Sequence, residues 1–106
     1  MAALIPLSDI LRRPEAYEPD DVVYVPANAS DVGLDTEVRV ELHGSVAPEE
    51  LAGYRYLLEA GVIREVVDGL ASALGRAPTE AQSLRAVLYY AENDAFPDMQ
   101  IVFGPD

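Results

Sequence analysis

The sequence contains no cysteine, no tryptophan and no lysine, and it has only one histidine. The lack of cysteine excludes disulfides, thiolate nucleophiles and thiolate metal sites. The serines do not occur in a Gly-x-Ser-x-Gly turn, and no glycine-rich phosphate loop is present. His43 and Glu41 stand close together in the sequence, but one histidine and one carboxylate are too few for a metal site. We therefore predict a protein that is not an enzyme and has no catalytic residues, no metal and no cofactor.

Positive charge is also scarce in this chain. Nineteen acidic residues face seven basic ones, all of them arginine, which gives a formal net charge of −12. Such a field repels DNA, RNA and anionic membranes, and it accelerates encounter with a cationic partner. An acidic surface can also serve only to keep a small protein soluble. We expect no direct binding to nucleic acid or membrane, and we expect any protein partner to be basic.

Long hydrophobic runs are absent as well, so no segment is predicted to cross a membrane. The apolar run at residues 2–5 is cut by Pro6 and has no basic residue before it, unlike a signal peptide. We therefore expect a cytoplasmic protein. The chain has 106 residues, half of them hydrophobic, which is enough for a single domain over residues 1–106 with its own core.

Residue spacing predicts the elements of the first half of the chain. Residues 7–13 are typical of a short helix with Ser8 as its N-cap and Pro14 as its stop. The β-branched run at 22–25 predicts a buried strand, and residues 36–43 alternate as a strand with one wet face does. These two strands are expected to pair antiparallel. The core-facing residues of the second strand are predicted to be Val38, Val40 and Leu42.

The second half of the chain is predicted to contain two helices. Residues 61–74 carry an apolar face and are followed by Gly75, a residue suited to a helix C-cap. Residues 80–92 form the second helix, and Thr79 with Gln82 matches a capping box at its start. The apolar stripe of this second helix is predicted to contain Leu84, Val87, Leu88 and Ala91.

Two further segments have strand character. Residues 54–59 alternate as a strand does, although their leucines and tyrosines also fit a helical spacing; we favour the strand. Residues 99–103 are predicted to add a last strand. The expected fold class is therefore α+β: a small antiparallel sheet packed against two helices, 61–74 and 80–92, with a short N-terminal helix.

Two acidic segments are candidate binding surfaces. The loop at 15–21 contains four acids, and the end of the helix 80–92 combines tyrosines with carboxylates. Tyrosine is enriched in protein interfaces, and an acidic rim suits a basic surface such as the cleft of a nuclease. The residues predicted to bind a partner are Glu15, Glu18, Asp20 and Asp21 in the loop, and Tyr89, Glu92 and Asp94 at the helix end.

Several blocks of the sequence occur in an order that resembles a known bacterial family. They are Leu7-x-x-Ile10-Leu11 with Pro14, Val23-Tyr24-Val25-Pro26, Tyr56-x-Leu58-Glu59, and the final block Leu88-Tyr89-Tyr90-x-x-Asn93-Asp94-Ala95-Phe96. From Leu7 to Phe96 the chain resembles a family known mainly as a domain of unknown function, whose members end in a similar Tyr-Tyr-x-x-Asn-Asp-Ala-Phe block. The resemblance implies a small intracellular bacterial protein, similar in style to the immunity proteins of toxin–immunity pairs. It supplies no catalytic residue.

These observations lead to one functional hypothesis and two alternatives. The hypothesis is an immunity-type inhibitor that neutralises a basic cognate toxin, for example a nuclease, by binding it. The first alternative is an acidic DNA mimic from a phage or mobile element, with carboxylates arrayed at phosphate-like spacing. The second alternative is a soluble structural domain with no tight partner. The sequence leaves the oligomeric state open.

Overall fold

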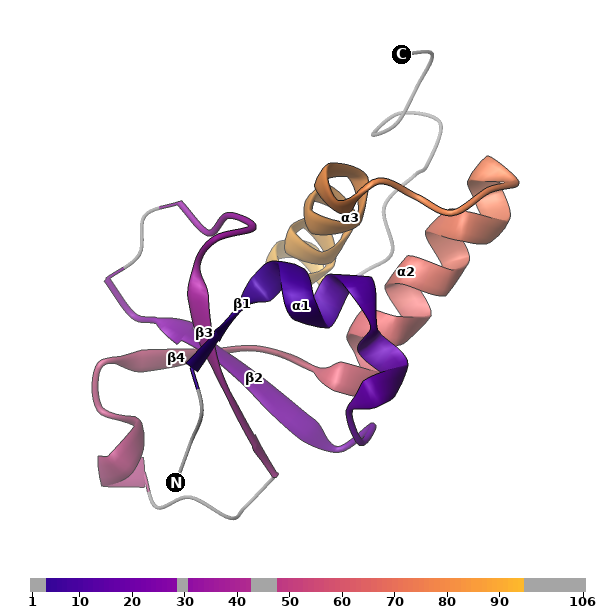
Figure 1. The fold of residues 1–106 in the computed structure, drawn as a ribbon. Helices are drawn as coiled ribbons and strands as arrows, with labels where there is room; N and C mark the ends of the chain where they lie inside the picture. The colour runs from indigo at the N-terminus through magenta and orange to yellow at the C-terminus, as the bar shows by residue number, and fades with distance from the viewer. Residues whose placement is uncertain (1–3, 29–30, 43–47, 95–106) are drawn as a thin grey trace.

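The computed structural model describes residues 4–28, 31–42 and 48–94. Its four-stranded antiparallel sheet has the order β1-β3-β2-β4, and three α-helices pack on one face of it (Figure 1). The predicted α+β class is confirmed. The strands are β1 (Leu4–Pro6), β2 (Asp21–Pro26), β3 (Glu37–Leu42) and β4 (Tyr54–Glu59); the helices are α1 (Leu7–Arg12), α2 (Ala60–Leu74) and α3 (Glu80–Asn93), with short 3-10 helices η1 (Pro14–Ala16) and η2 (Pro48–Leu51).

Strand β2 lies inside the sheet and supplies two of its most buried side chains. It pairs antiparallel with both neighbours, so that Val23 is opposite Val40 of β3 and Leu58 of β4. Val23 and Val25 are fully buried, as is Val38 of β3. Because side chains alternate between the two faces of a strand, these valines define the face that the helices cover. The two strands predicted in the first half therefore form and pair as expected.

Strand β4 contains one extra residue. Val23 is paired with Leu58, whereas the next residue of β2, Tyr24, is paired with Tyr56, which leaves Leu57 between them as a bulge. A bulge interrupts the alternation of side chains, and here both Leu57 and Leu58 are buried in the core. The predicted strand at 54–59 is confirmed. The two consecutive core leucines explain why its spacing also fitted a helix.

Helix α2 is anchored by a stripe of large side chains. Ile63, Val66 and Leu70 are fully buried and lie at helical spacing on the face toward the sheet. The helix ends at Gly75, which is left-handed with φ of 70°, and the Gly75 N–H donates to the carbonyl of Ala71. The predicted helix and its glycine C-cap are therefore confirmed.

Helix α3 begins with the predicted capping box. The Gln82 N–H donates to the Thr79 hydroxyl at 3.1 Å, and the Thr79 N–H donates to the Gln82 side-chain oxygen at 2.9 Å. The predicted apolar stripe was partly wrong. The most buried residues are Ser83, Ala86 and Val87, whereas Leu84, Leu88 and Ala91 are only partly buried. Helix α3 packs against both α1 and α2, and small side chains permit this close approach on two sides.

The predicted helix at 7–13 is confirmed as α1, but its cap is not the predicted one. It begins at Leu7 directly after β1, and Ser8 is a buried residue of its first turn rather than its N-cap. The first N–H groups of the helix find other partners: Leu7 donates to the carbonyl of Thr36 at 2.9 Å, and Ser8 donates to the carbonyl of Leu34 at 3.0 Å. The segment before β3 therefore replaces a side-chain cap.

Two differences concern the sheet. Strand β1 was not predicted, and its residues Leu4, Ile5 and Pro6 pair with the first half of β3. Leu42 was expected in the core but is 57% exposed, because it lies opposite Asp21 where β2 begins, at the margin of the sheet. The predicted strand at 99–103 lies outside the described residues. Within the described ranges, no helix is long and apolar enough to cross a membrane.

Candidate binding site

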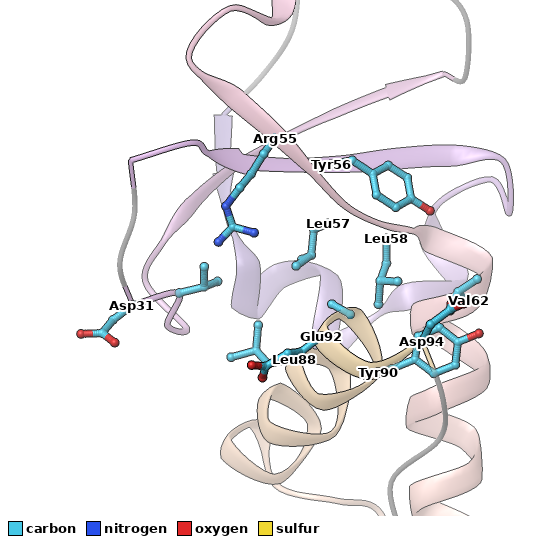
Figure 2. Close-up of a pocket in the computed structure, with 12 residues that line it drawn as sticks. Asp31, Arg55, Tyr56, Leu57, Leu58, Val62, Leu88, Tyr90, Glu92 and Asp94 are labelled. Atoms are coloured by element: carbon cyan, nitrogen blue, oxygen red, sulfur yellow. The ribbon is translucent and has the colours of Figure 1, made fainter.

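A pocket of about 660 Å³ lies between β4 and the C-terminal half of α3 (Figure 2). We call it the β4–α3 pocket. Its apolar lining comes from β4, the start of α2, α3 and Val32 of the loop before β3. Its polar lining combines one arginine, two tyrosines and three carboxylates. The residues that line it are Asp31, Val32, Arg55, Tyr56, Leu57, Leu58, Val62, Leu88, Tyr90, Ala91, Glu92 and Asp94.

Arg55 is placed in this pocket by the register of β4. It lies opposite Val25, and since paired residues of neighbouring strands share a face, the Arg55 side chain lies on the helix-covered side of the sheet. Figure 2 shows the guanidinium pointing from β4 toward α3. The side chain is nevertheless exposed, because the core ends at Leu57. A cation thus stands at the open end of the core.

The end of α3 supplies the facing carboxylates. Glu92 lies one turn after Leu88, so both residues line the pocket from the same side of the helix. Asp94 ends the helix in the left-handed region with φ of 52°, and its N–H donates to the carbonyl of Tyr90 at 2.7 Å. The Asn93 side chain donates to the carbonyl of Tyr89 at 2.9 Å. These bonds fix the turn that holds Asp94 at the pocket.

The charges at this helix end are unfavourable for the helix itself. The C-terminus of an α-helix carries the negative end of its dipole, where basic side chains are stabilising. The last turn of α3 contains no basic residue, and Glu92 and Asp94 add negative charge there. The potential at this end of the pocket is therefore strongly negative, and a cation placed there would relieve it.

The pKa of Tyr56 responds to a charge on the other side of the pocket. The side chain of Tyr56 is 53% exposed and points to the other side of β4 from Arg55 (Figure 2). Burial raises the pKa of Tyr56 above its ordinary value, the charges of Glu59 and Asp94 raise it further, and a main-chain hydrogen bond with Glu59 opposes them. Asp94 of α3 and Tyr56 of β4 therefore act on each other although they belong to opposite walls.

The acidic loop at 15–21 has a different structure. Glu15, Glu18 and Asp20 are exposed. Asp21 instead accepts a hydrogen bond from the Glu18 N–H at 3.1 Å, and its own N–H donates to the Glu18 carbonyl at 3.0 Å. The carboxylate of Asp21 thus stabilises the turn that leads into β2. Only the other three acids present their charge without such a bond to the loop.

The loop is held against the first turn of α2 at a close contact. The Gly61 N–H donates to the carbonyl of Pro19 at 3.1 Å, and a Cβ at Gly61 would lie 3.1 to 3.2 Å from Pro19 atoms. The next residue, Val62, lines the β4–α3 pocket. The acidic loop and the pocket therefore lie on different sides of the same helical turn.

The predicted binding residues are thus divided between two surfaces. Glu92 and Asp94 line the β4–α3 pocket, whereas Tyr89, 37% exposed, is not among the described residues that line it. Glu15 lines a smaller hollow of about 310 Å³ between α1, α2 and the start of α3. In that hollow Arg12 binds Glu80 at 2.7 Å, and it also binds Asp9 at 3.2 Å, so part of the negative charge there is already paired.

Sequence reasoning missed the contribution of β4 to the pocket. Arg55, Tyr56 and Tyr90 line it and were not among the predicted residues. No local signal identified Arg55, because Tyr54, Tyr56 and Leu58 alternate as an apolar face in the sequence and the bulge at Leu57 is what brings Arg55 to the core side. Within the described ranges, no three residues of the types His, Cys, Asp and Glu are grouped as metal ligands are.

The chain was compared with known protein families, curated proteins and solved structures. The model of a family described as a domain of unknown function, DUF7716, matches residues 4–99 of the chain. No curated protein and no solved structure is significantly similar to it.

Proposed function

The chain belongs to the DUF7716 family, and we propose that this member is a non-enzymatic protein-binding module, an immunity-type inhibitor that neutralises a basic toxin in the cytoplasm. One observation carries the proposal: Glu92 and Asp94 stand at the negative end of α3, without a basic residue in that turn, beside a pocket with an apolar floor. This arrangement disfavours the free helix and favours a bound cationic surface.

The overall charge supports a basic partner. Even if every arginine neutralised a different carboxylate, the formal net charge of −12 would remain. Arg12, Arg39 and Arg64 form ion pairs within the described part of the chain. The remaining field steers a cationic protein and raises its association rate about 10- to 1,000-fold. Steering explains fast capture, which an inhibitor of a lethal protein needs.

The chemistry of the pocket supports a protein rather than a small ion as the partner. Its floor contains Leu57, Leu58 and Leu88, and its walls contain Tyr56 and Tyr90. Apolar and aromatic contacts at the centre with charged residues at the rim are the usual anatomy of a protein interface. A DNA mimic instead needs carboxylates in a regular array, and the predicted acids fall on two separate surfaces.

The proposal is tested by capture and rescue. The tagged chain is incubated with nuclease-treated lysate of its own host and washed at low and then high salt. We expect one stoichiometric basic protein to survive high salt, to arrest growth when expressed alone, and to lose this effect when the chain is co-expressed. Nucleic-acid-binding proteins that are released together at high salt would support the mimic, and an empty column would support the plain structural domain.

A matched pair of variants localises the interaction. Glu92→Gln with Asp94→Asn removes two charges from the β4–α3 pocket. Asp35→Asn with Glu65→Gln removes the same charge from exposed positions outside it. We expect the first pair to lose capture and rescue and the second to retain both. Equal losses would contradict the pocket as the binding site.

A further inference from the structure

The free edge of β4 borders the β4–α3 pocket. β4 is the last strand in the order β1-β3-β2-β4, and among the described residues it pairs with β2 alone. The pocket is lined by Arg55 and also by Tyr56, whose side chains lie on opposite faces of the strand. A single pocket can be lined by residues of both faces only if it extends around the outer edge of β4. At that edge the main chain of β4 is accessible.

The direction of the main-chain groups at this edge follows from one hydrogen bond. The Ala27 N–H donates to the Gly53 carbonyl at 2.7 Å, which marks that pair as hydrogen-bonded. In an antiparallel ladder the N–H and C=O groups of successive residues point alternately toward and away from the neighbour. The groups of Arg55 therefore point to β2, and those of Tyr54 and Tyr56 point to the free edge.

The side chains beside this edge determine what can occupy it. A second copy paired through its own β4 would bring two Arg55 side chains close together on one face, and like charges across a strand pair are unfavourable. A partner strand avoids this when it places an acidic residue opposite Arg55. Basic residues two positions before or after that acid would share its face of the added strand and would lie toward Glu92 and Asp94.

We propose that the β4–α3 pocket binds an extended strand of the basic partner, which adds to the edge of β4 at Tyr54–Tyr56 and places an acidic side chain opposite Arg55. This inference rests on the proposed function and names the part of the partner that is recognised. Edge addition uses main-chain hydrogen bonds for affinity and side-chain pockets for specificity. The bulge at Leu57 ends the regular ladder, so the added strand is short.

The test uses a displayed library of random short peptides selected on the full-length chain. We expect enriched peptides in which apolar residues alternate with polar ones, and in which an acid has lysine or arginine two positions before or after it. In synthetic copies, N-methylation of every second amide should weaken binding on the order of tenfold or more, and methylation of the intervening amides should have little effect. Equal effects at all positions, or no enriched peptide, would overturn strand addition.

A charge exchange tests the register. The variant Arg55→Glu should lose affinity for the acidic peptide by about tenfold and regain it for a peptide with lysine in place of that acid. Arg64→Glu makes the same charge change on the exposed side of α2 and should leave both affinities unchanged. Loss without recovery in the exchanged peptide would refute the pairing with Arg55.

Main-chain participation is tested on the protein side by Tyr56→Pro, which removes an N–H from the free edge, with Tyr56→Phe as the control that keeps it. Both variants are first checked for an unchanged circular dichroism spectrum, and the peptide methylation pattern stands if the proline variant fails to fold. A dimer that only Tyr56→Pro dissociates would assign the edge to a second copy instead. If the chain captures a toxin but N-methylation has no alternating effect on peptide binding, the proposed function stands and this inference is rejected.

Discussion

Helices α2 and α3 are neighbours of similar length, 15 and 14 residues, that are stabilised in opposite ways. α2 has no side-chain hydrogen bond at its N-cap but buries Ile63, Val66 and Leu70 completely and ends at a glycine. α3 has a complete capping box but buries mainly small residues and ends at a left-handed aspartate. Packing in the core stabilises α2, whereas the capping hydrogen bonds at the N-terminus of α3 stabilise α3.

The difference indicates which helix is free to serve binding. Departures from local rules that have no structural benefit tend to mark functional sites. α2 follows the rules for a helix end, with Gly75 in the left-handed conformation. α3 breaks them at Asp94 and in the acidic last turn, where the β4–α3 pocket lies. We therefore expect the C-terminal half of α3 to be the part of the fold whose residues serve binding to a partner at the expense of folding stability.

The largest expected effect compares a core leucine in each helix. Leu70→Ala in α2 should lower the free energy of unfolding by about 3 kcal/mol, because a fully buried side chain is removed and a cavity remains. Leu88→Ala in α3 should cost only about 1 kcal/mol, since Leu88 is partly buried and its site opens to the pocket. Urea unfolding at constant m-value measures both. Equal losses would contradict the distinction between the helices.

The helix starts provide the second comparison. Thr79→Ala removes the hydroxyl of the capping box and should destabilise the protein by about 1 kcal/mol. Glu59→Ala, at the N-cap of α2, should have little effect, because that side chain makes no capping hydrogen bond. Both melting temperatures can be read by circular dichroism. A larger loss for Glu59→Ala would mean that α2 also depends on its start.

The helix ends should respond in opposite directions to exchange of their residues. Asp94→Gly should stabilise the protein by about 1 kcal/mol, since glycine adopts the left-handed conformation without strain and a charge is removed from the negative helix end. Gly75→Asp should destabilise it by a similar amount. In calorimetry, we also expect Asp94→Gly to weaken binding to the basic partner. A variant that is both more stable and an equally good binder would remove the proposed role of Asp94.

The smallest effect concerns alkaline pH. The folded protein raises the pKa of Tyr56 above its ordinary value of 10.0, so the resulting stabilisation is fully present below that pH and is lost as pH rises through the folded pKa. Asp94→Asn should lower the pKa of Tyr56, because one of the charges that raise it is removed. Titration followed by tyrosinate absorbance measures this, with Tyr56→Phe to assign the signal. No shift in the Asn variant would show that the two pocket walls are not coupled.

The elements that sequence alone predicted are those determined by nearby residues. The capping box at Thr79, the C-cap at Gly75 and the valine strand β2 all follow from contacts within a few positions. Strand β1 was missed because its stability comes from pairing with β3, more than thirty positions away, and Pro6 masks its strand character. Ser8 was misassigned because its N–H partner, the carbonyl of Leu34, is also remote in the sequence.

The pocket was only half predictable for the same reason. Glu92 and Asp94 were recognisable from the acidic end of a helix, but their relation to Arg55 depends on how α3 packs beside β4. The bulge at Leu57 decides which side chains of β4 enter the core, and no local signal separates it from a helical stripe. The position of the acidic loop likewise depends on the contact of Pro19 with Gly61.

The same bulge also has a consequence for solubility. Deletion of Leu57 would make β4 a regular strand, with Leu58 following Tyr56 in uninterrupted alternation and a longer flat edge. Long regular edges rich in aromatic and aliphatic residues recruit further chains and form aggregates. We expect the deletion variant to aggregate on heating, as light scattering would record, despite its unchanged net charge. The bulge at Leu57 is thus expected to protect the exposed edge of the sheet from edge-to-edge aggregation.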